Sequence, residues 1–540
     1  MKNKLLLITA TALIISFSHS ETKGLPVQGV PVPEFSFLDD MVLAWMDEIE
    51  SNAAVVGIMH NDKVVYLRGF GYIDQDRSIP MPETAKVRIA SVVKPITAAA
   101  IHEMVNDPDI DLEWDSYAFN FGTTHGGILH LNPYPRLADH RLALVQISHL
   151  LQHRAGWDRD APHTPEDWPE WDNSDNPNEN RWALYCQNPN AYSGDDAIPS
   201  NATLPDYTTR NCVIAQEMGT VNEDDEPRLP NREEILRWIL GKQLICSPGE
   251  RYAYSNEGYL ALGLIIDELA PEGYMEFLRT RILTPNIGIP ETEFAEVRTK
   301  RSDAIGDTPS GSPFREPYYL SNFSADDVFD LCDSTVSNEA YGRLHLEARL
   351  THGGVKASAT ALLHFANTFR VGDSGNLAMG RRLTNHPLSP SESRSHGGSQ
   401  GGVNTYLVQR GDGVRMFIFF NRRDSDWSAR SFYQGSNKEF NYQSHLGKNI
   451  DNLDQYFDSL QPSDWPTKDV EGFWTRSGKP VAQKRYFGGY DQPFLDLQSA
   501  LSFARTGTRI RILPGVVDWT GTISTPVSIE APEGPVTIGN

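Results

Sequence analysis

Ser91 and Lys94 stand three residues apart in the stretch RIASVVKPITAAAIHEMVND. Residues at this spacing share one face of a helix, so the lysine amine would reach the serine hydroxyl. Apolar residues recur with helical spacing after Ser91, and Pro95 suits only a first turn, so we expect a helix that begins at or close to Ser91. A helix N-terminus also favours the negative charge that develops during acyl transfer. The pair therefore indicates a serine nucleophile with a lysine beside it.

Tyr254 and Asn256 form a second candidate group, Tyr-x-Asn, where PGERYAYSNEGYLALGLIIDE enters another helical pattern. A tyrosine beside a lysine ammonium can have a lowered pKa, take the serine proton and later return it to a leaving group. An asparagine amide can both donate to and accept from a substrate amide. In isolation the same residues also fit a packed tyrosine and a helix cap.

The stretch RSHGGSQGGVNTY contains a third candidate, which has two interpretations. Gly397 to Gly401 fit G-x-S-x-G, the nucleophile elbow that presents a serine between a buried strand and a helix in α/β-hydrolases. Here the polar loop sequence NHPLSPSESRS comes before the motif, and an alternating strand pattern follows it. We therefore expect Ser399 to be a backbone donor that faces the nucleophile, and a nucleophilic Ser399 is the alternative.

S-x-x-K, Y-x-N and H-x-G follow one another in this order, and together they resemble the motifs of serine hydrolases related to class C β-lactamases. That family includes penicillin-binding-protein-like DD-carboxypeptidases, D-aminopeptidases and similar esterases. The segments ISHLLQHRAGW and THGGVKASATALLHFANTF also resemble family segments, and the resemblance covers roughly residues 40–445. It implies an α/β plus all-α, β-lactamase/transpeptidase-like fold, in which an antiparallel sheet is flanked by helices and a helical domain is inserted.

The resemblance also implies a role for each matching residue. Ser91 would be the acylated nucleophile, and Lys94 and Tyr254 would be the proton-transfer pair, either of which could be the general base. The substrate and oxyanion contacts would come from Asn256, His396, Gly398 and Ser399. The backbone N–H groups of Ser91 and Ser399 would form the oxyanion hole, because glycine beside Ser399 lets the strand approach the substrate closely.

Two residues depart from the family pattern. His396 stands where β-lactamases have lysine, which favours the peptidase and esterase branch over β-lactam hydrolysis. Leu362 stands where relatives usually have an aspartate, which concerns a local helix cap and not the chemistry.

The composition limits the class of partner. The chain has 540 residues, 39% of them hydrophobic, a formal net charge of -23 and a pI near 5.1. Such a charge repels nucleic acids and anionic membranes, so we expect a small-molecule or peptide substrate and no nucleic-acid partner. The segments that we expect are a signal peptide (1–20), a linker (21–39), the hydrolase domain (40–447), a connector (448–485) and a β-helix-like fragment (486–540).

Strand patterns lie at both ends of the hydrolase domain. Residues 53–74 predict two strands joined at Asn61 and Asp62, and NTYLVQRGDGVRMFIFFNRRD predicts two more around Gly-Asp-Gly. The sequence between them is mostly helix and loop. We therefore expect a sheet completed by the return of the chain, with helices inserted.

The N-terminal MKNKLLLITATALIISFSHS has two lysines, a short apolar run and small residues, which predicts a secretory signal peptide and a secreted or periplasmic protein without a membrane anchor. An uncleaved anchor is the alternative. Export makes the four cysteines, Cys186, Cys212, Cys246 and Cys332, candidates for two disulfides. We favour pairing Cys186 with Cys212, because both lie in one irregular polar segment, and free buried thiols are the alternative.

Residues 157–232 form a polar insertion rich in tryptophan, and Trp157, Trp168, Trp171 and Trp182 could pack this lobe or line a substrate groove. His149 and His153 are four apart on an expected helix, but no H-E-x-x-H pattern accompanies them. We therefore expect no metal and no cofactor. At the other end of the domain, residues 486–540 resemble the opening of a parallel β-helix, which needs stacked units. This fragment could dock on the hydrolase domain, contact carbohydrate, self-associate, or continue in a longer chain.

The sequence thus predicts an exported serine hydrolase that forms an acyl-enzyme at Ser91 with a D-amino-acid peptide, an ester or a β-lactam. Two alternatives remain. One is a catalytically idle penicillin-recognising fold used as a binding module, and the other is an α/β-hydrolase with Ser399 as its nucleophile. The presence of Lys94 and Tyr254 together argues against an idle fold.

Overall fold

The computed structural model describes most of the chain. The described residues are 24–157, 211–223, 225, 228–244, 246–283, 293–299, 316–320, 328–330, 335–337, 339–342, 344–372, 375–423, 432–434, 437–439, 453–475, 488–491, 493–504 and 506–539. The expected signal peptide, three of the four tryptophans of the insertion, Cys186 and Cys332 lie outside them. Cys246 is a buried free thiol. The expectation that the four cysteines form two disulfides is therefore wrong for Cys246.

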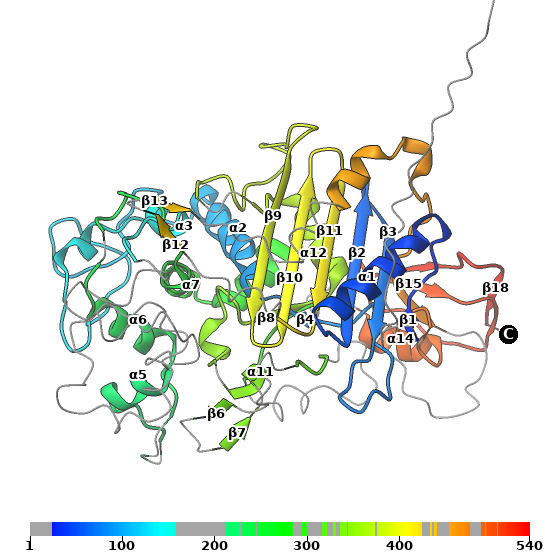
Figure 1. Ribbon diagram of the computed structural model, residues 1–540, viewed down its shortest axis with the longest axis horizontal. Helices are drawn as coiled ribbons and strands as arrows, with labels where there is room; N and C mark the ends of the chain where they lie inside the picture. Colours follow the sequence, from blue (N-terminus) through cyan, green and yellow to red (C-terminus); the bar gives the residue numbers. More distant parts are fainter. Residues whose placement is uncertain are drawn as a thin grey trace, which may run out of the picture.

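A six-stranded antiparallel sheet forms the centre of the molecule, in the order β1-β3-β2-β11-β10-β9 (Figure 1). Its strands, in chain order, are β1 (Val27–Gln28), β2 (Ala53–His60), β3 (Lys63–Gly71), β9 (Ser393–Gln400), β10 (Val403–Arg410) and β11 (Val414–Phe420). Strands from both ends of the hydrolase domain therefore meet in one sheet, as the sequence predicts, and β9 is an edge strand.

The two predicted hairpins are present. Asn61 and Asp62, with φ of 49° and 65°, make the turn between β2 and β3, and both residue types tolerate this left-handed conformation. Gly413 has φ of 93° at the turn between β10 and β11. The HGGS motif itself lies on β9, which begins at Ser393, so the polar loop ends earlier than the sequence suggests and no helix leaves Gly401.

Two helices cover opposite faces of the sheet near its middle. The first is α1 (Ser36–Glu48), and the second, α12 (Ala359–Thr368), packs where Gly57 leaves room, because a Cβ at Gly57 would lie 3.0 Å from Leu363 Cδ1. Leu362 is fully buried, and the Ser358 hydroxyl caps α12 by accepting from the Ala361 N–H at 3.2 Å. The helix is therefore capped by Ser358, although position 362 has leucine in place of an aspartate.

Most of the other helices gather on one side of the sheet, at the left of Figure 1. They comprise α2 (Val93–Asn106), α3 (Ile147–Leu151), α5 (Asn211–Met218), α6 (Arg232–Leu240), α7 (Asn256–Leu269), α8 (Tyr274–Phe277) and a π-helical turn (Leu278–Leu283). Small elements complete this part: β6 (Val328–Asp330), β7 (Thr335–Ser337), α11 (Glu339–Gly342), β12 (Phe432–Gln434) and β13 (Asn437–Glu439). No helix among the described residues is long and apolar enough to cross a membrane.

A second, three-stranded sheet joins the helical part to the main sheet. It pairs β4 (Val87–Arg88) and β5 (Phe294–Glu296) with β8 (Val355–Ala357). The buried Glu316 carboxylate reinforces it by accepting from Arg88 Nε at 2.6 Å and from Lys356 Nζ at 3.0 Å. This small sheet fixes the chain that leads into Ser91 beside the chain that follows residues 349–354.

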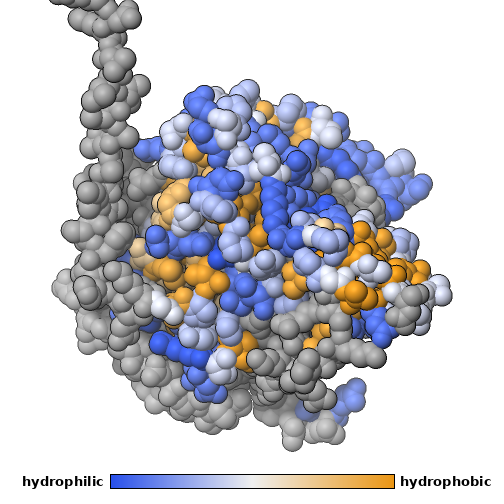
Figure 2. Space-filling view, turned by 90° about the vertical axis from the view of Figure 1, so that its right-hand side faces the viewer, coloured by the Kyte–Doolittle hydropathy of each residue, from blue (hydrophilic) through white to orange (hydrophobic). Residues whose placement is uncertain are grey.

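The C-terminal extension consists of stacked parallel strands, the pairing that a β-helix has. In it, β14 (Phe473–Thr475), β15 (Arg509–Ile512) and β17 (Ser528–Glu530) form one sheet, and β16 (Gly515–Val517) pairs with β18 (Val536–Ile538). The helix α14 (Leu497–Phe503) closes a small apolar core with Ile510 and Ile512. Its outer surface exposes Val516, Ile523 and Ile538, on the side of the molecule that Figure 2 shows.

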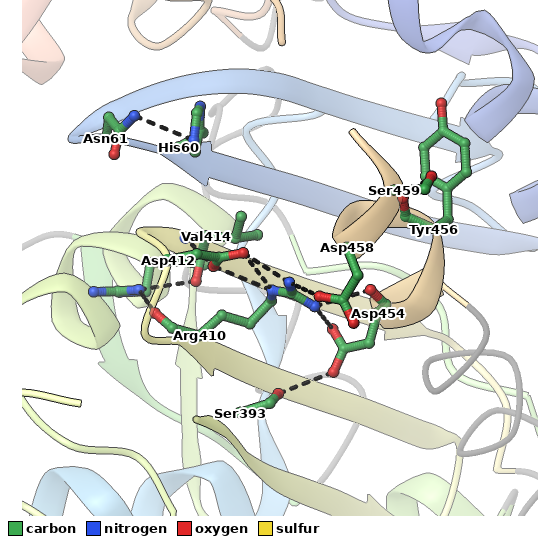
Figure 3. A network of polar contacts seen from close by, with 11 residues as sticks. His60, Asn61, Ser393, Arg410, Asp412, Val414, Asp454, Tyr456, Asp458 and Ser459 are labelled. Carbon is green, nitrogen blue, oxygen red and sulfur yellow. Dashed lines mark hydrogen bonds and ion pairs between the residues drawn. The ribbon is translucent and has the colours of Figure 1, made fainter. Parts of the chain in front are cut away.

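Polar contacts attach residues 453–459, which precede this extension, to the sheet. Arg410 of β10 donates to Asp412 and to the helical segment 453–459, where it contacts the Asp454 carbonyl at 2.9 Å and the Asp458 carboxylate (Figure 3). Asp454 also accepts from Ser393 Oγ at 2.9 Å. The segment that leads to the extension is therefore fixed to β10 and, through Ser393, to β9, which carries the HGGS motif.

Glu83 forms a second attachment point, and its carboxyl is nearly solvent-free at 4% exposure. It accepts the Tyr490 N–H at 2.7 Å, and the neighbouring Asp491 accepts the Gly29 N–H at 2.7 Å. Burial is the main cause that raises the pKa of Glu83 to about 7. The folded protein therefore holds a proton there that the unfolded chain releases near pH 4.5, so stability falls as pH rises from about 4.5 through 7.

We expect Glu83→Gln to abolish this pH dependence. The amide keeps an oxygen acceptor for Tyr490 and never ionises, so the variant should gain about 2–4 kcal/mol over wild type at pH 8 and little at pH 5. Thermal unfolding midpoints at the two pH values measure this, with the exposed Glu34→Gln as the matched control. An equal shift at both pH values would contradict the assignment.

Candidate active site

Ser91 lies in a tight 3-10 turn, Ala90–Val92, which runs directly into α2. The sequence predicts a helix that begins at or close to Ser91. The α-helix begins at Val93, two residues later, and the turn before it carries the serine. Ala90 has a left-handed φ of 46°, a conformation that non-glycine residues adopt at a cost. Strand β8 anchors the approach, because Val355 O accepts the Ile89 N–H at 3.1 Å.

The Lys94 ammonium is fully buried and is held by three oxygens from separate parts of the chain. Its Nζ donates to Ser91 Oγ at 3.1 Å, to Asn256 Oδ1 at 2.8 Å and to His352 O at 3.2 Å. The predicted contact between Ser91 and Lys94 is therefore present, and the asparagine of Y-x-N is one of the groups that hold the lysine in place.

Tyr254 completes a three-residue cluster around the serine hydroxyl. Its OH donates to Ser91 Oγ at 3.0 Å, and Lys94 Nζ lies 4.8 Å from its ring centroid. The His153 ring stacks on the tyrosine ring at a centroid distance of 4.6 Å, and its Nδ1 accepts the Ser255 N–H at 3.1 Å. The tyrosine is thus fixed from behind by a histidine.

The helix α7 begins at Asn256 because Ser255 caps it, with Ser255 Oγ accepting the Gly258 N–H at 3.2 Å. The cap places Tyr254 just before the helix and Asn256 on its first turn, so both face Lys94. His149 accepts the Gln146 N–H at 3.2 Å in its own helix cap. The two histidines of HLLQH therefore have structural contacts, and the described residues contain no group of three potential metal ligands.

Strand β9 passes close to Ser91 at Gly398. A Cβ on Gly398 would lie 2.5 Å from Ile89 O and 3.1 Å from Ser91 N, so only glycine allows this approach. Ser399 follows it, pairs with Asn404 across β9 and β10, and has a buried Oγ with no hydrogen-bond partner among the described residues. The structure thus brings the backbone of the HGGS motif, and not the Ser399 hydroxyl, to the nucleophile.

His396 is buried on the face of β9 that Gly398 presents to Ser91, since the two are two residues apart on a strand. Burial, and then the charge of Lys94, lowers the pKa of His396 to about 3. Its Nδ1 lies 2.9 Å from the Gly397 carbonyl, which can only accept, so Nδ1 carries the proton and Nε2 is left as an acceptor. The side chain is therefore a neutral imidazole.

Two residues of the site had no assigned chemistry in the sequence analysis. His352 contributes only its backbone carbonyl to Lys94, and a backbone contact leaves no residue-type signal. His153 supports Tyr254 and was considered there only as a metal ligand or a structural histidine. Its contact with Ser255 could not be predicted from spacing, because it joins two segments about a hundred residues apart.

The neutral state of His396 can be tested directly. We expect its ring nitrogens to keep the shifts of a neutral Nδ1–H tautomer from pH 8 to pH 5 in histidine-labelled protein followed by nitrogen NMR. The spectrum of His396→Asn assigns the signal. A titration midpoint near 6.5, the ordinary histidine pKa, would show that this imidazole is solvated and would contradict the buried geometry.

The chain is similar to several proteins of known sequence or structure. A relative in Staphylococcus aureus (strain N315), Protein flp, is 24% identical over 262 residues, 48% of this chain and 38% of its own length, and the strain MW2 protein is 26% identical over 260 residues. The matched part of the chain therefore spans well under half the length of these relatives. Among solved structures, the D-amino acid amidase from Ochrobactrum anthropi SV3 with D-phenylalanine is 17% identical, with 79% of this chain and 98% of that one covered and a TM-score of 0.45.

A penicillin-binding protein homologue from Pyrococcus abyssi is also 17% identical and covers 72% of this chain and 73% of its own, with a TM-score of 0.43. The decisive match is to a family model, Beta-lactamase, which extends over residues 38–431 and so includes the Ser91, Tyr254 and His396 motifs. The chain belongs to the β-lactamase family of serine hydrolases.

Proposed function

We propose that this serine hydrolase forms an acyl-enzyme at Ser91 with an amide or ester substrate. The observation that carries the proposal is the double contact at the serine hydroxyl, which accepts from Lys94 Nζ at 3.1 Å and from Tyr254 OH at 3.0 Å. Two proton carriers within hydrogen-bond reach of one hydroxyl are what nucleophilic catalysis requires. Ser399 has no comparable partner, which supports its exclusion as nucleophile.

Acylation proceeds by attack of Ser91 Oγ on the substrate carbonyl as its proton passes to Lys94 or Tyr254. That proton is then delivered to the leaving nitrogen or oxygen, and water attacks the acyl-enzyme with the same pair in the reverse role. Whichever residue accepts the proton must first be in its deprotonated form. The geometry serves both choices equally, since both heavy atoms lie at similar distances from Oγ.

The oxyanion of the tetrahedral intermediate is stabilised by the backbone N–H groups of Ser91 and Ser399. The close approach of Gly398 to Ser91 N supports this assignment, because it brings the two donors to one side of the hydroxyl. Asn256, whose Oδ1 is occupied by Lys94, offers its amide NH2 to the substrate.

Within the family we favour a peptidase or esterase over a β-lactamase, with D-amino-acid peptides and esters as substrates. The neutral imidazole of His396 supports this choice, because it supplies no positive charge where β-lactamases have lysine. We also propose that the protein is exported, on the strength of the signal-like residues 1–20.

Intact-mass spectrometry after exposure to a fluorophosphonate tests the nucleophile. We expect one adduct on wild type, none on Ser91→Ala, and an undiminished adduct on the matched Ser399→Ala, because that hydroxyl makes no contact with Lys94 or Tyr254. An adduct lost only in Ser399→Ala would assign an α/β-hydrolase mechanism. No adduct on any variant would instead indicate the idle binding fold.

A substrate panel separates the branches. We expect turnover of D-alanyl peptides or short-chain esters to exceed that of a chromogenic cephalosporin by about 100-fold or more in kcat/KM, a difference of about 2.7 kcal/mol in transition-state stabilisation. Efficient cephalosporin hydrolysis would contradict the assignment from His396.

A further inference from the structure

Arg349 is a buried arginine for which the described residues supply no counter-ion. It ends a 3-10 turn, Glu347–Arg349, is 7% exposed, and its Nε has no hydrogen-bond partner among them. No ion pair involves it within the described parts of the chain. A buried Nε–H without an acceptor costs free energy, so an acceptor that arrives from outside would stabilise this side chain.

Gln400 lies beside Arg349 and is also buried with unsatisfied polar atoms. Its side chain is 4% exposed, and neither Oε1 nor Nε2 finds a partner among the described residues. Both side chains border Gly353, because a Cβ there would make ordinary van der Waals contact with Gln400 Oε1 at 3.5 Å and with Arg349 Nε at 3.6 Å, and glycine leaves that volume unfilled. A guanidinium and a carboxamide therefore face one small space above a glycine.

This space adjoins the nucleophile. Gln400 shares its strand face with His396 and Gly398, since side chains two apart on a strand point the same way. Gly398 approaches Ser91, so Gln400 lies on the other side of this contact point from His396. The backbone carbonyl of His352, the residue before Gly353, accepts from Lys94.

The turn that carries Arg349 is rigid. Its carbonyl accepts three N–H groups, from His352 at 3.0 Å, Gly353 at 2.8 Å and Gly354 at 2.8 Å. A Cβ at Gly354 would lie 2.3 Å from Leu346 O, so the turn needs glycine there. The backbone of Arg349 is thus held in position before any ligand binds, which reduces the entropy lost on binding.

The local field also favours an anion. The charges of Arg349, Lys94 and Arg232 act together on His352 and, after burial, are what lowers its pKa well below the ordinary value. Of these three cations, Arg232 is paired with Asp267, at 2.9 Å, and Lys94 is held by neutral oxygens. Asn404 and Ser399, also without side-chain partners, lie on the opposite face of the sheet and do not join this group.

We propose that Arg349 and Gln400 form a subsite that binds a carboxylate of the substrate next to the bond that Ser91 attacks. The Arg349 guanidinium and the Gln400 amide NH2 donate to the two carboxylate oxygens, a planar arrangement that arginine matches well. The inference rests on the proposed acyl-enzyme function and deepens it: the substrate is an anionic amide or ester.

Matched esters test the subsite. One pair puts a carboxylate on the acyl group, p-nitrophenyl hydrogen glutarate against p-nitrophenyl pentanoate, and the other on the leaving group, 4-acetoxybenzoate against phenyl acetate. In the pair whose anion reaches Arg349, wild type should prefer the anionic ester, and Arg349→Gln should lower that preference in kcat/KM by about 10-fold or more. An unchanged preference in both pairs would overturn the proposal.

Two further variants keep the test independent of stability. Gln400→Glu places a carboxylate beside Arg349 with little change in size, so we expect a higher unfolding midpoint together with a lost anion preference. Arg394→Gln is the matched control. Arg394 lies on β9, as Gln400 does, but it pairs with Glu392 at 2.9 Å and its side chain is 40% exposed. Its ester preference should equal that of wild type, and a loss equal to that of Arg349→Gln would contradict a specific subsite.

A binding measurement distinguishes failure of the subsite from failure of the proposed function. Glutarate should bind Ser91→Ala in isothermal titration calorimetry, and binding should be at least 10-fold weaker when Arg349→Gln is added. Glutarate binding by a protein whose Ser91 is never acylated would retain the subsite and reject the acyl-enzyme. Acylation of Ser91 with no glutarate binding would do the reverse.

Discussion

The burial of the Lys94 ammonium is the constraint on which the site depends. A charge with no exposed surface must be surrounded by acceptors, and Lys94 finds acceptors in the 3-10 turn at Ser91, the start of α7 and the turn at His352. These segments are distant in the chain, so the lysine can be satisfied only when the helical part and the sheets are assembled. The arrangement that stabilises the lysine also places it at the serine hydroxyl.

The motifs could be predicted because each depends on local chemistry. S-x-x-K requires only that Ser91 and Lys94 share a helix face, and Ser255 caps the helix that carries Asn256. The turn residues Asn61 and Asp62 predicted the first hairpin for a similar reason. Exclusion of the G-x-S-x-G elbow also needed only the neighbouring residues, although β9 begins earlier than they suggested.

The other features of the site and of the fold depend on contacts between distant segments, which cannot be predicted from the types of single residues. Arg349 and Gln400 look like ordinary surface residues in the sequence. Only the fold shows that both are buried, with Arg349 Nε and the Gln400 carboxamide lacking hydrogen-bond partners among the described residues. Glu83 likewise gained its role from a segment about four hundred residues later, where Tyr490 donates to it. The parallel strands of the extension were anticipated from their spacing, whereas the polar contacts that attach residues 453–459 to β10 were not.

The central claim is that the buried lysine makes Ser91 a nucleophile, and the rate of the acylation step tests it most directly. In a stopped-flow burst experiment with p-nitrophenyl acetate, Lys94→Met should acylate at least about 100-fold more slowly than wild type. Its unfolding midpoint should fall, because Asn256 Oδ1 and His352 O lose Lys94 as a donor, so the rates are compared at a temperature where both proteins are folded. Acylation of Ser91 in Lys94→Met at the wild-type rate would contradict the account.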